Sequence, residues 1–210
     1  MNMIDKIRNL DDYKIYKIVN SDETELCKIM NKYGSDKGNN INHNYTKLYY
    51  ELFNDIRYEK INILEIGIGS INPKIIQSCN INPNYVPGAS HYGWRDYFPN
   101  SQIYGCDIDR DIINFNDDRI KGYYLDQRDT KCVIDTFYTG ELRDVQFDII
   151  IDDGIHNFDI NWNLMNILFP KLKTNGLYII EDLIDFNFNR VIKIYNCEWN
   201  YIFLPNRNNS

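Results

Sequence analysis

Two short apolar runs of the sequence end in carboxylates. FDIIIDDGIH covers residues 147–156, and LYIIED covers residues 177–182. Such runs are typical of buried parallel strands, whose ends deliver polar groups to the rim of a sheet. The separation between Asp153 and Glu181 leaves room for one crossover helix between two neighbouring strands. In that case the two strand ends would lie about 5 Å apart.

Asp153, Glu181 and Asp182 could therefore share one divalent cation, with His156 one short turn away. Carboxylate oxygens suit magnesium, calcium or manganese, and a nearby histidine suits proton abstraction. The alternative is that these residues are only the solvated polar ends of two buried strands. Three carboxylates and a histidine at two adjacent strand ends favour the functional interpretation.

The first apolar run, residues 61–67, ends in a glycine-rich turn with the sequence EIGIG. Its backbone at Gly67 and Gly69 could approach a ligand closely. A dinucleotide-binding turn would have a third glycine, but Asn72 stands at that position, so the sequence disfavours NAD. An ordinary turn is the alternative interpretation of the two glycines.

Asp107 ends the second apolar run, where a carboxylate could accept hydrogen bonds from both hydroxyls of a ribose. Asp126 and Gln127 follow the third run and could bond to the edge of an adenine. Together with the glycine-rich turn, these residues predict a nucleoside-containing cofactor at the carboxyl ends of the strands.

The elements that position these residues alternate along the chain. This β-α-β-α order predicts an α/β fold with a doubly wound, mostly parallel sheet and helices on both faces. The periodicity predicts strands at 61–67, 102–107, 119–125, 147–152, 177–182 and 199–204. It predicts helices near 23–31, 45–56, 90–97, 130–138, 158–172 and 187–195, and a short helix between the second and third strands.

A long connection at 71–93 separates the glycine-rich turn from the next elements. It carries Tyr85, His91 and Tyr92, whose side chains suit sugar faces and hydroxyls. Long loops in compact domains are often lids or binding loops. We therefore expect this segment to govern the choice of acceptor, although the aromatic side chains could instead pack on the body of the protein.

Length and charge restrict the class of protein. The 210 residues predict one domain, with 1–58 as an N-terminal helical segment contributing to the site and 59–210 as the core. The net charge of -7 and the pI near 5.0 argue against a nucleic-acid or membrane-surface binder. The five cysteines are scattered without a CxxC pair, which fits a reducing compartment. Without a signal sequence or a membrane-spanning run, the sequence predicts a cytoplasmic protein.

Taken together, these motifs resemble class I S-adenosylmethionine-dependent methyltransferases. LEIGIG is similar to the first motif of that fold, GCDID to its ribose-binding acidic motif, and LDQRD to its adenine-side motif. More specifically, KYGSDKG, HNYTKLYYELF, GASHYGWRDYFPNSQIYGCDID, DDGIH and IIEDL resemble a metal-dependent family of sugar O-methyltransferases. The resemblance covers about residues 30–184. It implies a Rossmann-like methyltransferase sheet, S-adenosylmethionine as cofactor, and Mg²⁺ or Mn²⁺ as metal.

The resemblance also implies roles for individual residues. Asp153, Glu181 and Asp182 match the metal ligands, and His156 matches the general base. The residues implied at cofactor positions, or near the methionine end of the cofactor, are Glu65, Gly67, Gly69, Asp107, Asp126, Gln127, Asp152, Ser35, Asp36 and Lys37. Two features depart from the family pattern: Ile155 stands where a small residue is common, and the chain ends where the fold expects a last antiparallel strand.

The activity implied is methylation of a sugar hydroxyl, in the biosynthesis of surface polysaccharide or another glycoconjugate. The acceptor sugar would be free, nucleotide-linked or glycan-linked, and a homo-oligomer is compatible with the sequence. Two alternatives stay open. One is methyl transfer to another small diol or a phosphorylated metabolite, and the other is a non-catalytic cofactor-binding protein on the same fold.

Overall fold

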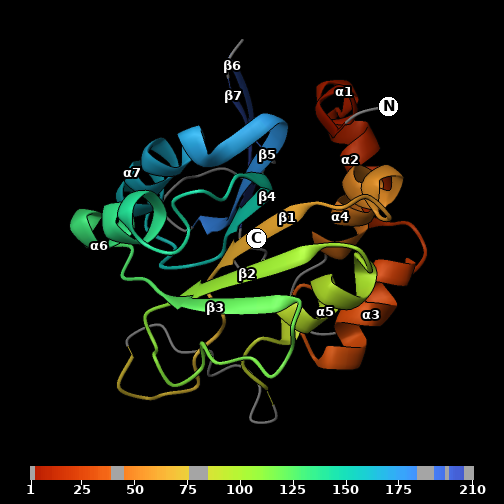
Figure 1. Ribbon diagram of the computed structural model, residues 1–210. Coiled ribbons are helices and arrows are strands. Elements are labelled where there is room, and N and C mark those ends of the chain that lie inside the picture. The colour runs from red at the N-terminus through yellow and green to blue at the C-terminus, as the bar shows by residue number, and fades with distance from the viewer. Residues whose placement is uncertain (1–2, 39–44, 76–84, 184–191, 197–198, 206–210) are drawn as a thin grey trace.

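The structure is a computed structural model, and it describes residues 3–38, 45–75, 85–183, 192–196 and 199–205. Its strands are β1 (Asn62–Ile66), β2 (Gln102–Asp107), β3 (Ile120–Tyr124), β4 (Phe147–Asp152), β5 (Leu172–Leu183), β6 (Ile192–Asn196) and β7 (Trp199–Pro205). They form one sheet in the order β3-β2-β1-β4-β5-β7-β6 (Figure 1). Every neighbouring pair except β6 and β7 is parallel, which confirms the predicted fold class.

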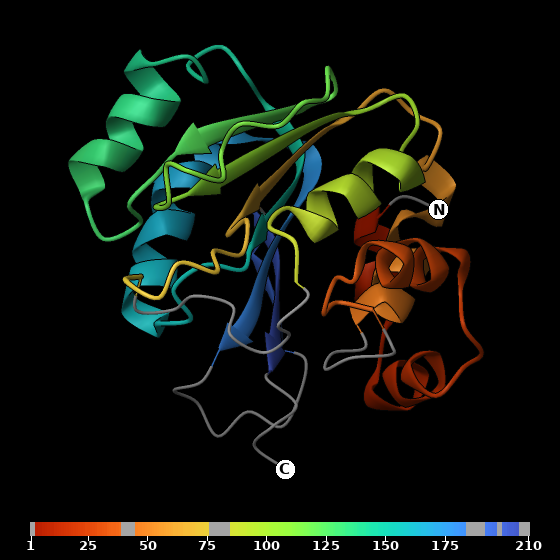
Figure 2. The same cartoon turned by 90° about the horizontal axis from the view of Figure 1, so that it is seen from below.

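Helices cover both faces of the sheet (Figure 1 and Figure 2). The N-terminal helices and α5 lie on one face, and α6 and α7 lie on the other. Short helical turns at Asn54–Ile56, Asp135–Thr139 and Phe169–Lys171 extend α4, α6 and α7. The helices are α1 (Met3–Asn9), α2 (Asp12–Val19), α3 (Glu25–Tyr33), α4 (Tyr45–Phe53), α5 (Ala89–Tyr97), α6 (Thr130–Ile134) and α7 (Phe158–Leu168).

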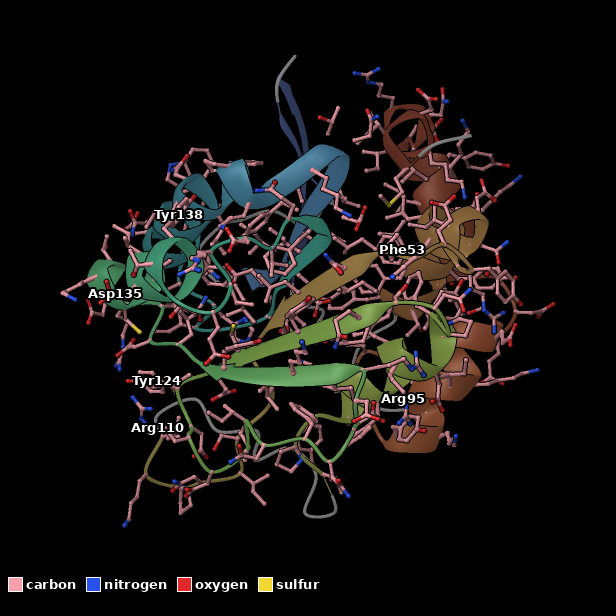
Figure 3. The ribbon with its side chains drawn as sticks, in the orientation of Figure 1. Phe53, Arg95, Arg110, Tyr124, Asp135 and Tyr138 are labelled. Atoms are coloured by element: carbon pink, nitrogen blue, oxygen red, sulfur yellow. The ribbon has the colours of Figure 1, made fainter. Side chains whose placement is uncertain are left out.

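Each face of the sheet has its own hydrophobic core, because successive residues of a strand point to opposite faces. Ile63 of β1 packs with Trp94 of α5 on the face covered by the N-terminal helices. The next residue, Leu64, packs on the opposite face with α6 and α7. Figure 3 shows this separation, with Phe53 of α4 on one side of the sheet and Tyr138 beside α6 on the other.

The helix predicted near 23–31 is α3, and its ends follow from its sequence. Thr24 caps the first turn, with its side chain accepting a hydrogen bond from the backbone of Cys27. Gly34 ends the helix in the left-handed conformation, at a φ of 73°. The sequence analysis gave no bounds for α1 and α2, which precede α3.

The short helix predicted between the second and third strands is wrong. The segment between β2 and β3 consists of turns. The carboxylates of Asp107, Asp109 and Asp117 each accept a hydrogen bond from the backbone N–H two residues later. Such local side-chain bonds compete with helical hydrogen bonding and favour turns.

The C-terminal helix predicted at 187–195 is wrong for residues 192–195, whereas residues 187–191 lie outside the described part of the chain. Residues 192–196 form β6, which pairs with β7 as an antiparallel hairpin. The sheet therefore has an antiparallel edge strand, whereas the sequence analysis expected this strand to be absent. Strand pairing has overridden the local pattern here, as tertiary context often does.

The topology brings the predicted site residues together. β4 lies between β1 and β5, and its last residue, Asp152, is in register with Ile66 and Ile180. The carboxyl ends of these parallel strands therefore meet at one edge of the sheet, beside α4. Among the described residues, no helix is long and apolar enough to cross a membrane.

Candidate active site

Three side chains that could hold a metal ion lie together at the carboxyl ends of β4 and β5. Asp153 directly follows β4, His156 lies on the turn after it, and Asp182 is near the end of β5. Each offers one ligand atom, and these atoms all lie within 4.8 Å of one another. Nε2 of His156 is 3.9 Å from Oδ1 of Asp153, which is beyond hydrogen-bonding distance. The structure thus brings together three of the four residues predicted at these strand ends.

Two of the three residues have a backbone conformation that is unusual for a residue with a side chain. His156 and Asp182 both have a φ of 52°, in the left-handed region. Such a conformation costs about 1–3 kcal/mol, and residues that adopt it cluster at functional sites. Nδ1 of His156 is also buried, with no hydrogen-bond partner among the described residues. Two carboxylates and an incompletely bonded imidazole fit the donor set of a divalent-cation site with an adjacent base.

Glu181, the fourth predicted residue, has other partners. Its side chain is almost fully buried, and its Oε1 accepts a hydrogen bond from the hydroxyl of Tyr49. Its Oε2 accepts one from Nζ of Lys37 at 2.6 Å. Burial raises the pKa of Glu181 well above its ordinary value, although Lys37 opposes this shift. The role of Glu181 as a metal ligand stays a prediction, because both of its oxygens bind to side chains of the N-terminal segment.

Lys37 is the cation at the centre of these carboxylates, and only 1% of its side chain is exposed. Its Nζ forms ion pairs with Oδ2 of Asp153, with Oε2 of Glu181 at 2.6 Å and with Oε1 of Glu65 at 3.2 Å. Burial opposes the positive charge, but the attraction of Asp153, Glu181 and Glu65 raises the pKa of Lys37 well above its ordinary value. Protein carboxylates surround its ammonium group, and the predicted contact of Lys37 with a cofactor stays a prediction.

Two tyrosines of α4 complete this network. The hydroxyl of Tyr45 donates a hydrogen bond to Oδ1 of Asp182 at 2.5 Å, and Tyr49 donates to Glu181. Tyr45 and Tyr49 are four residues apart, so they lie on the same face of the helix. Burial is the main cause that raises the pKa of both phenols. Both hydroxyls therefore stay protonated and act as hydrogen-bond donors to β5.

Glu65, near the end of β1, is fully buried. Its Oε1 accepts a hydrogen bond from the hydroxyl of Ser90 at 2.8 Å, and its Oε2 accepts one from the indole nitrogen of Trp94 at 2.7 Å. Lys37 supplies the third contact. All three donors belong to the protein, so Glu65 joins β1 to α5, and its predicted contact with a cofactor stays a prediction.

The glycine-rich turn after β1 packs directly against the turn that carries Asp153. Gly67 and Gly69 have φ values of 97° and 87°. A Cβ at Gly67 would overlap the backbone oxygen of Asp153, and one at Gly69 would overlap the hydroxyl of Tyr85. The N–H of Asp153 also donates to the carbonyl of Ile66 at 2.9 Å. The predicted cofactor turn and the predicted metal ligands are therefore adjacent.

Asp107 lies where a ribose-binding carboxylate is expected, at the end of β2. Its Oδ2 accepts a hydrogen bond from the backbone of Ile68, and its Oδ1 accepts one from the backbone of Asp109, both at 2.8 Å. Burial raises the pKa of Asp107, while the backbone donors oppose this shift. Asp109 in turn accepts a hydrogen bond from the hydroxyl of Ser70 at 2.5 Å. Two carboxylates thus lie beside the glycine-rich turn.

Gln127 holds the turn after β4 in place. Its Nε2 donates to Oδ1 of Asp152 at 2.8 Å, and its Oε1 accepts from the backbone of Ile155 at 2.9 Å. A Cβ at Gly154 would overlap the Gln127 amide, so a larger residue there would displace this side chain. Asp152 is fully buried, and burial raises its pKa to about 6. The predicted contacts of Gln127 and Asp152 with a cofactor stay predictions.

The other residues predicted to contact the cofactor have hydrogen-bond partners close to them in the sequence. Asp126 forms hydrogen bonds and an ion pair with Arg128, which lower the pKa of its carboxyl. Ser35 is buried, and its hydroxyl accepts a hydrogen bond from the backbone of Lys37 at 3.4 Å. Asp36 is partly exposed between them. The SDK segment therefore forms the turn that delivers Lys37 to the site.

The long connection at 71–93 is described only in part, because residues 76–84 lie outside the described residues. Tyr85 donates a hydrogen bond to a backbone oxygen of the glycine-rich turn at 3.2 Å. His91 is fully buried in α5 and stacks on a phenylalanine ring at 5.5 Å, and Tyr92 stacks on a tyrosine ring at 5.7 Å. These aromatic side chains pack on the body of the protein, and their role toward an acceptor stays a prediction.

The sequence analysis assigned no role in the site to Tyr49, Ser70 or Asp109. A signal for Tyr49 existed, because Tyr45 and Tyr49 stand at helical spacing in a run that otherwise packs against the core. Asp109 is the second carboxylate of the GCDID motif, two residues after Asp107. No feature of the local sequence indicates that Tyr49 contacts Glu181 or that Ser70 contacts Asp109.

Comparisons with known proteins place this geometry in context. No protein-family model matches the chain. Demethylmacrocin O-methyltransferase of Streptomyces fradiae is 32% identical over 163 residues, which are 78% of this chain and 37% of the relative. Mycinamicin VI 2''-O-methyltransferase of Micromonospora griseorubida is 32% identical over 164 residues, with the same two shares. The chain therefore spans well under half the length of these curated relatives.

Solved structures give the same result. MycE methyltransferase in complex with Mg and SAH matches with a TM-score of 0.61 at 32% identity, over 77% of this chain and 37% of that one. The complex of MycE with Mg, SAH and mycinamycin VI has the same TM-score at 28% identity, over 83% of this chain and 48% of that one. These similarities confirm the predicted resemblance and the Rossmann-like methyltransferase fold.

Proposed function

We propose that the chain transfers a methyl group to a sugar hydroxyl with the help of a divalent cation. It is related to S-adenosylmethionine-dependent sugar O-methyltransferases. The observation that carries the proposal is the group Asp153, His156 and Asp182, whose ligand atoms lie within 4.8 Å of one another. This group adjoins the glycine-rich turn after β1, which is the predicted cofactor turn. A protein that only bound a cofactor would have no need of such a group.

The cofactor would lie along the carboxyl ends of β1, β2 and β3. The turn at Gly67 and Gly69 would face it, and Asp107 would accept hydrogen bonds from its ribose hydroxyls. Asp126 and Gln127 follow β3 and would lie toward the adenine. S-adenosylmethionine would supply a methyl group on a sulfonium, which is an excellent leaving group. The solved MycE structures, which contain SAH, support this choice of cofactor.

The carboxylates of Asp153 and Asp182 would hold the divalent cation. Oxygen ligands suit Mg²⁺ or Mn²⁺, and the MycE structures contain Mg. A divalent cation bound there would polarise a hydroxyl of the acceptor and lower its pKa. Tyr45 holds Asp182 and Lys37 holds Asp153, so the protein orients both carboxylates before any ligand binds.

His156 would act as the general base. It would accept the proton of the acceptor hydroxyl at a ring nitrogen as the oxygen attacks the methyl carbon. The new O–C bond forms while the S–C bond breaks, and the products are a methyl ether, S-adenosylhomocysteine and a protonated His156. Alignment of the oxygen with the sulfonium supplies much of the remaining rate enhancement.

The acceptor is proposed only as a sugar hydroxyl on a glycoside. The names of the relatives describe macrolide and tetracenomycin glycosides; one of them, from Streptomyces olivaceus, methylates the 3' position of a methoxyrhamnosyl tetracenomycin and is 32% identical. Those names favour an antibiotic-like glycoside. The expected role in surface polysaccharide or glycoconjugate biosynthesis is a finer proposal that they do not support.

The test is a methyl-transfer assay with methyl-labelled cofactor. Deoxysugar glycosides, nucleotide-sugars and polysaccharide repeat units would be offered in parallel, each with and without EDTA. We expect label in a glycoside fraction that disappears in EDTA and returns with excess Mg²⁺. Label appearing only in catechol-like diols or phosphorylated metabolites would favour that rival reaction. Tight binding of S-adenosylhomocysteine without transfer to any acceptor would favour the non-catalytic alternative.

A further inference from the structure

The turn after β4, residues 153–156, is held by two different parts of the chain. Its first residue, Asp153, donates its N–H to the carbonyl of Ile66, the last residue of β1, at 2.9 Å. Its third residue, Ile155, donates its N–H to Oε1 of Gln127 at 2.9 Å. The half of the turn that leads to His156 is therefore held by a side chain from the segment after β3.

Gln127 uses both ends of its amide on this part of the chain. While Oε1 accepts from Ile155, Nε2 donates to Oδ1 of Asp152 at 2.8 Å. The amide lies directly on the backbone of Gly154, where a Cβ would overlap Oε1. Since β2 and β1 lie between β3 and β4 in the sheet, this contact comes from a connecting segment and not from strand pairing.

The backbone of His156 depends on such support. Its φ of 52° lies in the left-handed region, which a residue with a Cβ keeps only where its surroundings hold it there. Nδ1 of His156 is buried without a hydrogen-bond partner among the described residues, so no hydrogen bond of that atom orients the ring. The direction of the imidazole therefore follows the backbone of the turn.

We infer that Gln127 is a positioning residue for the general base, because its amide fixes the turn from which His156 reaches the acceptor hydroxyl. The amide is neutral, and its two hydrogen bonds go to Asp152 and Ile155. It therefore acts on the orientation of the imidazole and adds no charge to the metal side. The inference rests on the proposed function, because it takes His156 as the base.

This role differs in its kinetics from a contact with the cofactor. Removal of a cofactor contact weakens the binding of S-adenosylhomocysteine. Removal of a positioning residue lowers kcat at saturating substrates and leaves that affinity near the wild-type value. A residue that served only the stability of the fold would change the unfolding temperature and neither of these two quantities.

The first measurement observes the His156 ring directly, by nuclear magnetic resonance of protein labelled with ¹⁵N-histidine, with S-adenosylhomocysteine and Mg²⁺ added. The chain has three histidines, and His156→Asn identifies the signals of His156. We expect one sharp set of ring signals in the wild type. In Gln127→Met, which keeps the length of the side chain and removes both hydrogen bonds, the set should broaden or split. His91, which is buried in α5, should keep its signals.

The second measurement is turnover, with the deoxysugar glycoside that takes up label in the assay above. In Gln127→Met we expect kcat to fall by about 10- to 100-fold, because a small displacement of a reacting group has an effect of that size. Gln102→Met is the matched control. Gln102 is also partly buried, but it begins β2 at the opposite end of the sheet, and its described hydrogen bond is to a backbone carbonyl. It should change neither the ring signals nor kcat.

Gly154→Ala breaks the same contact from the other side, and it keeps the inference testable if Gln127→Met does not fold. The new Cβ would displace the Gln127 amide, so the ring signals and kcat should change as in Gln127→Met. The double variant Gln127→Met/Gly154→Ala should be no more impaired than the weaker of the two single variants, because both remove one contact. Fully additive losses would show that the two residues act separately and would overturn the inference.

The other outcomes separate this inference from the function on which it rests. Folded Gln127 and Gly154 variants with wild-type ring signals and wild-type kcat would overturn the inference alone. Weakened S-adenosylhomocysteine binding with unchanged ring signals would assign Gln127 to the cofactor and would also overturn it. Normal turnover in His156→Asn would contradict the base of the proposed function, whatever the ring signals of the Gln127 variant show.

Discussion

The carboxylates at the two ends of the site are held in different ways. On the metal side, which we define as Asp153, Glu181 and Asp182, the donors are side chains 116 to 144 residues away in the sequence: Lys37, Tyr45 and Tyr49. On the cofactor side, which we define as Asp107 and Asp109, the donors are backbone or hydroxyl groups 2 to 39 residues away: Ile68, Ser70, Asp109 and Asp111.

This difference assigns separate tasks to two parts of the chain. The cofactor side is built by turns within the Rossmann-like core, so its geometry depends on that core alone. The metal side takes its shape only when α4 and the turn before it pack against the ends of β4 and β5. Substitutions on one side should therefore leave binding on the other largely intact, and the predictions below test that separation.

The largest effect is expected from Asp182→Asn. Asparagine tolerates the left-handed backbone of residue 182 and keeps an oxygen for Tyr45, but it lacks the charge that a divalent cation requires. Turnover should fall by about four orders of magnitude, which corresponds to several kcal/mol of lost stabilisation of the transition state. Mn²⁺ binding should be lost in calorimetry while the affinity for S-adenosylhomocysteine is kept. Undiminished turnover in EDTA would disprove the metal side as defined here.

His156→Asn should have the next largest effect. The variant keeps a residue that accepts a φ of 52° but removes the imidazole, so turnover should fall by about 10²–10⁴. Thermal unfolding and S-adenosylhomocysteine affinity should stay as in the wild type. An unfolded variant would instead make His156 a structural residue. Normal turnover would mean that another group accepts the proton.

Asp152→Asn should change the dependence of stability on pH. The pKa of Asp152 is about 6 in the folded protein and about 3.8 ordinarily, so the native state binds this proton more tightly than the unfolded state. The protonated carboxyl therefore contributes to the stability of the folded state at acid pH, and this contribution is lost as pH rises through 6. Between pH 4 and pH 7 its share of the unfolding free energy should fall by about 2 kcal/mol.

Urea unfolding at both pH values measures this share as the difference between wild type and variant. The wild-type protein should lose about 2 kcal/mol more than Asp152→Asn over the same interval. Equal losses would show that the pKa of Asp152 is not raised in solution. Asp152 lies between the metal side and the cofactor side. The measurement therefore also shows how strongly burial acts on a carboxyl where the two sides meet.

The smallest effect is expected from Asp107→Ala on the cofactor side. Loss of the carboxylate should weaken S-adenosylhomocysteine binding by about 1–3 kcal/mol in calorimetry. Mn²⁺ affinity should not change, because the donors of the metal side come from another segment. Asp135→Ala, an exposed carboxylate on the far side of the sheet, is the control. Unchanged cofactor affinity in Asp107→Ala would remove Asp107 from the site.

Sequence patterns were most reliable where the chain determines its structure locally. The strands at 102–107 and 147–152 have the predicted bounds, and the apolar runs at 61–67, 119–125 and 177–182 each overlap a strand of the sheet. The predictions failed where side chains or strands override local propensity. Aspartates turned the segment before β3 into loops, and pairing with β7 made a strand of residues 192–196.

The sequence by itself determined that Asp153, His156 and Asp182 stand at the ends of two buried strands, because a polar group directly after an apolar run must reach the rim of a sheet. Only the tertiary structure decided what surrounds them. The N-terminal segment could have packed elsewhere on the sheet. Nothing in the sequences KYGSDKG and YTKLYYELF indicates which carboxylates Lys37 and Tyr49 bind. The physical reason is that such contacts are long-range. They form between side chains that only the complete packing of α4 against the sheet brings together, and they leave no periodic trace in the sequence.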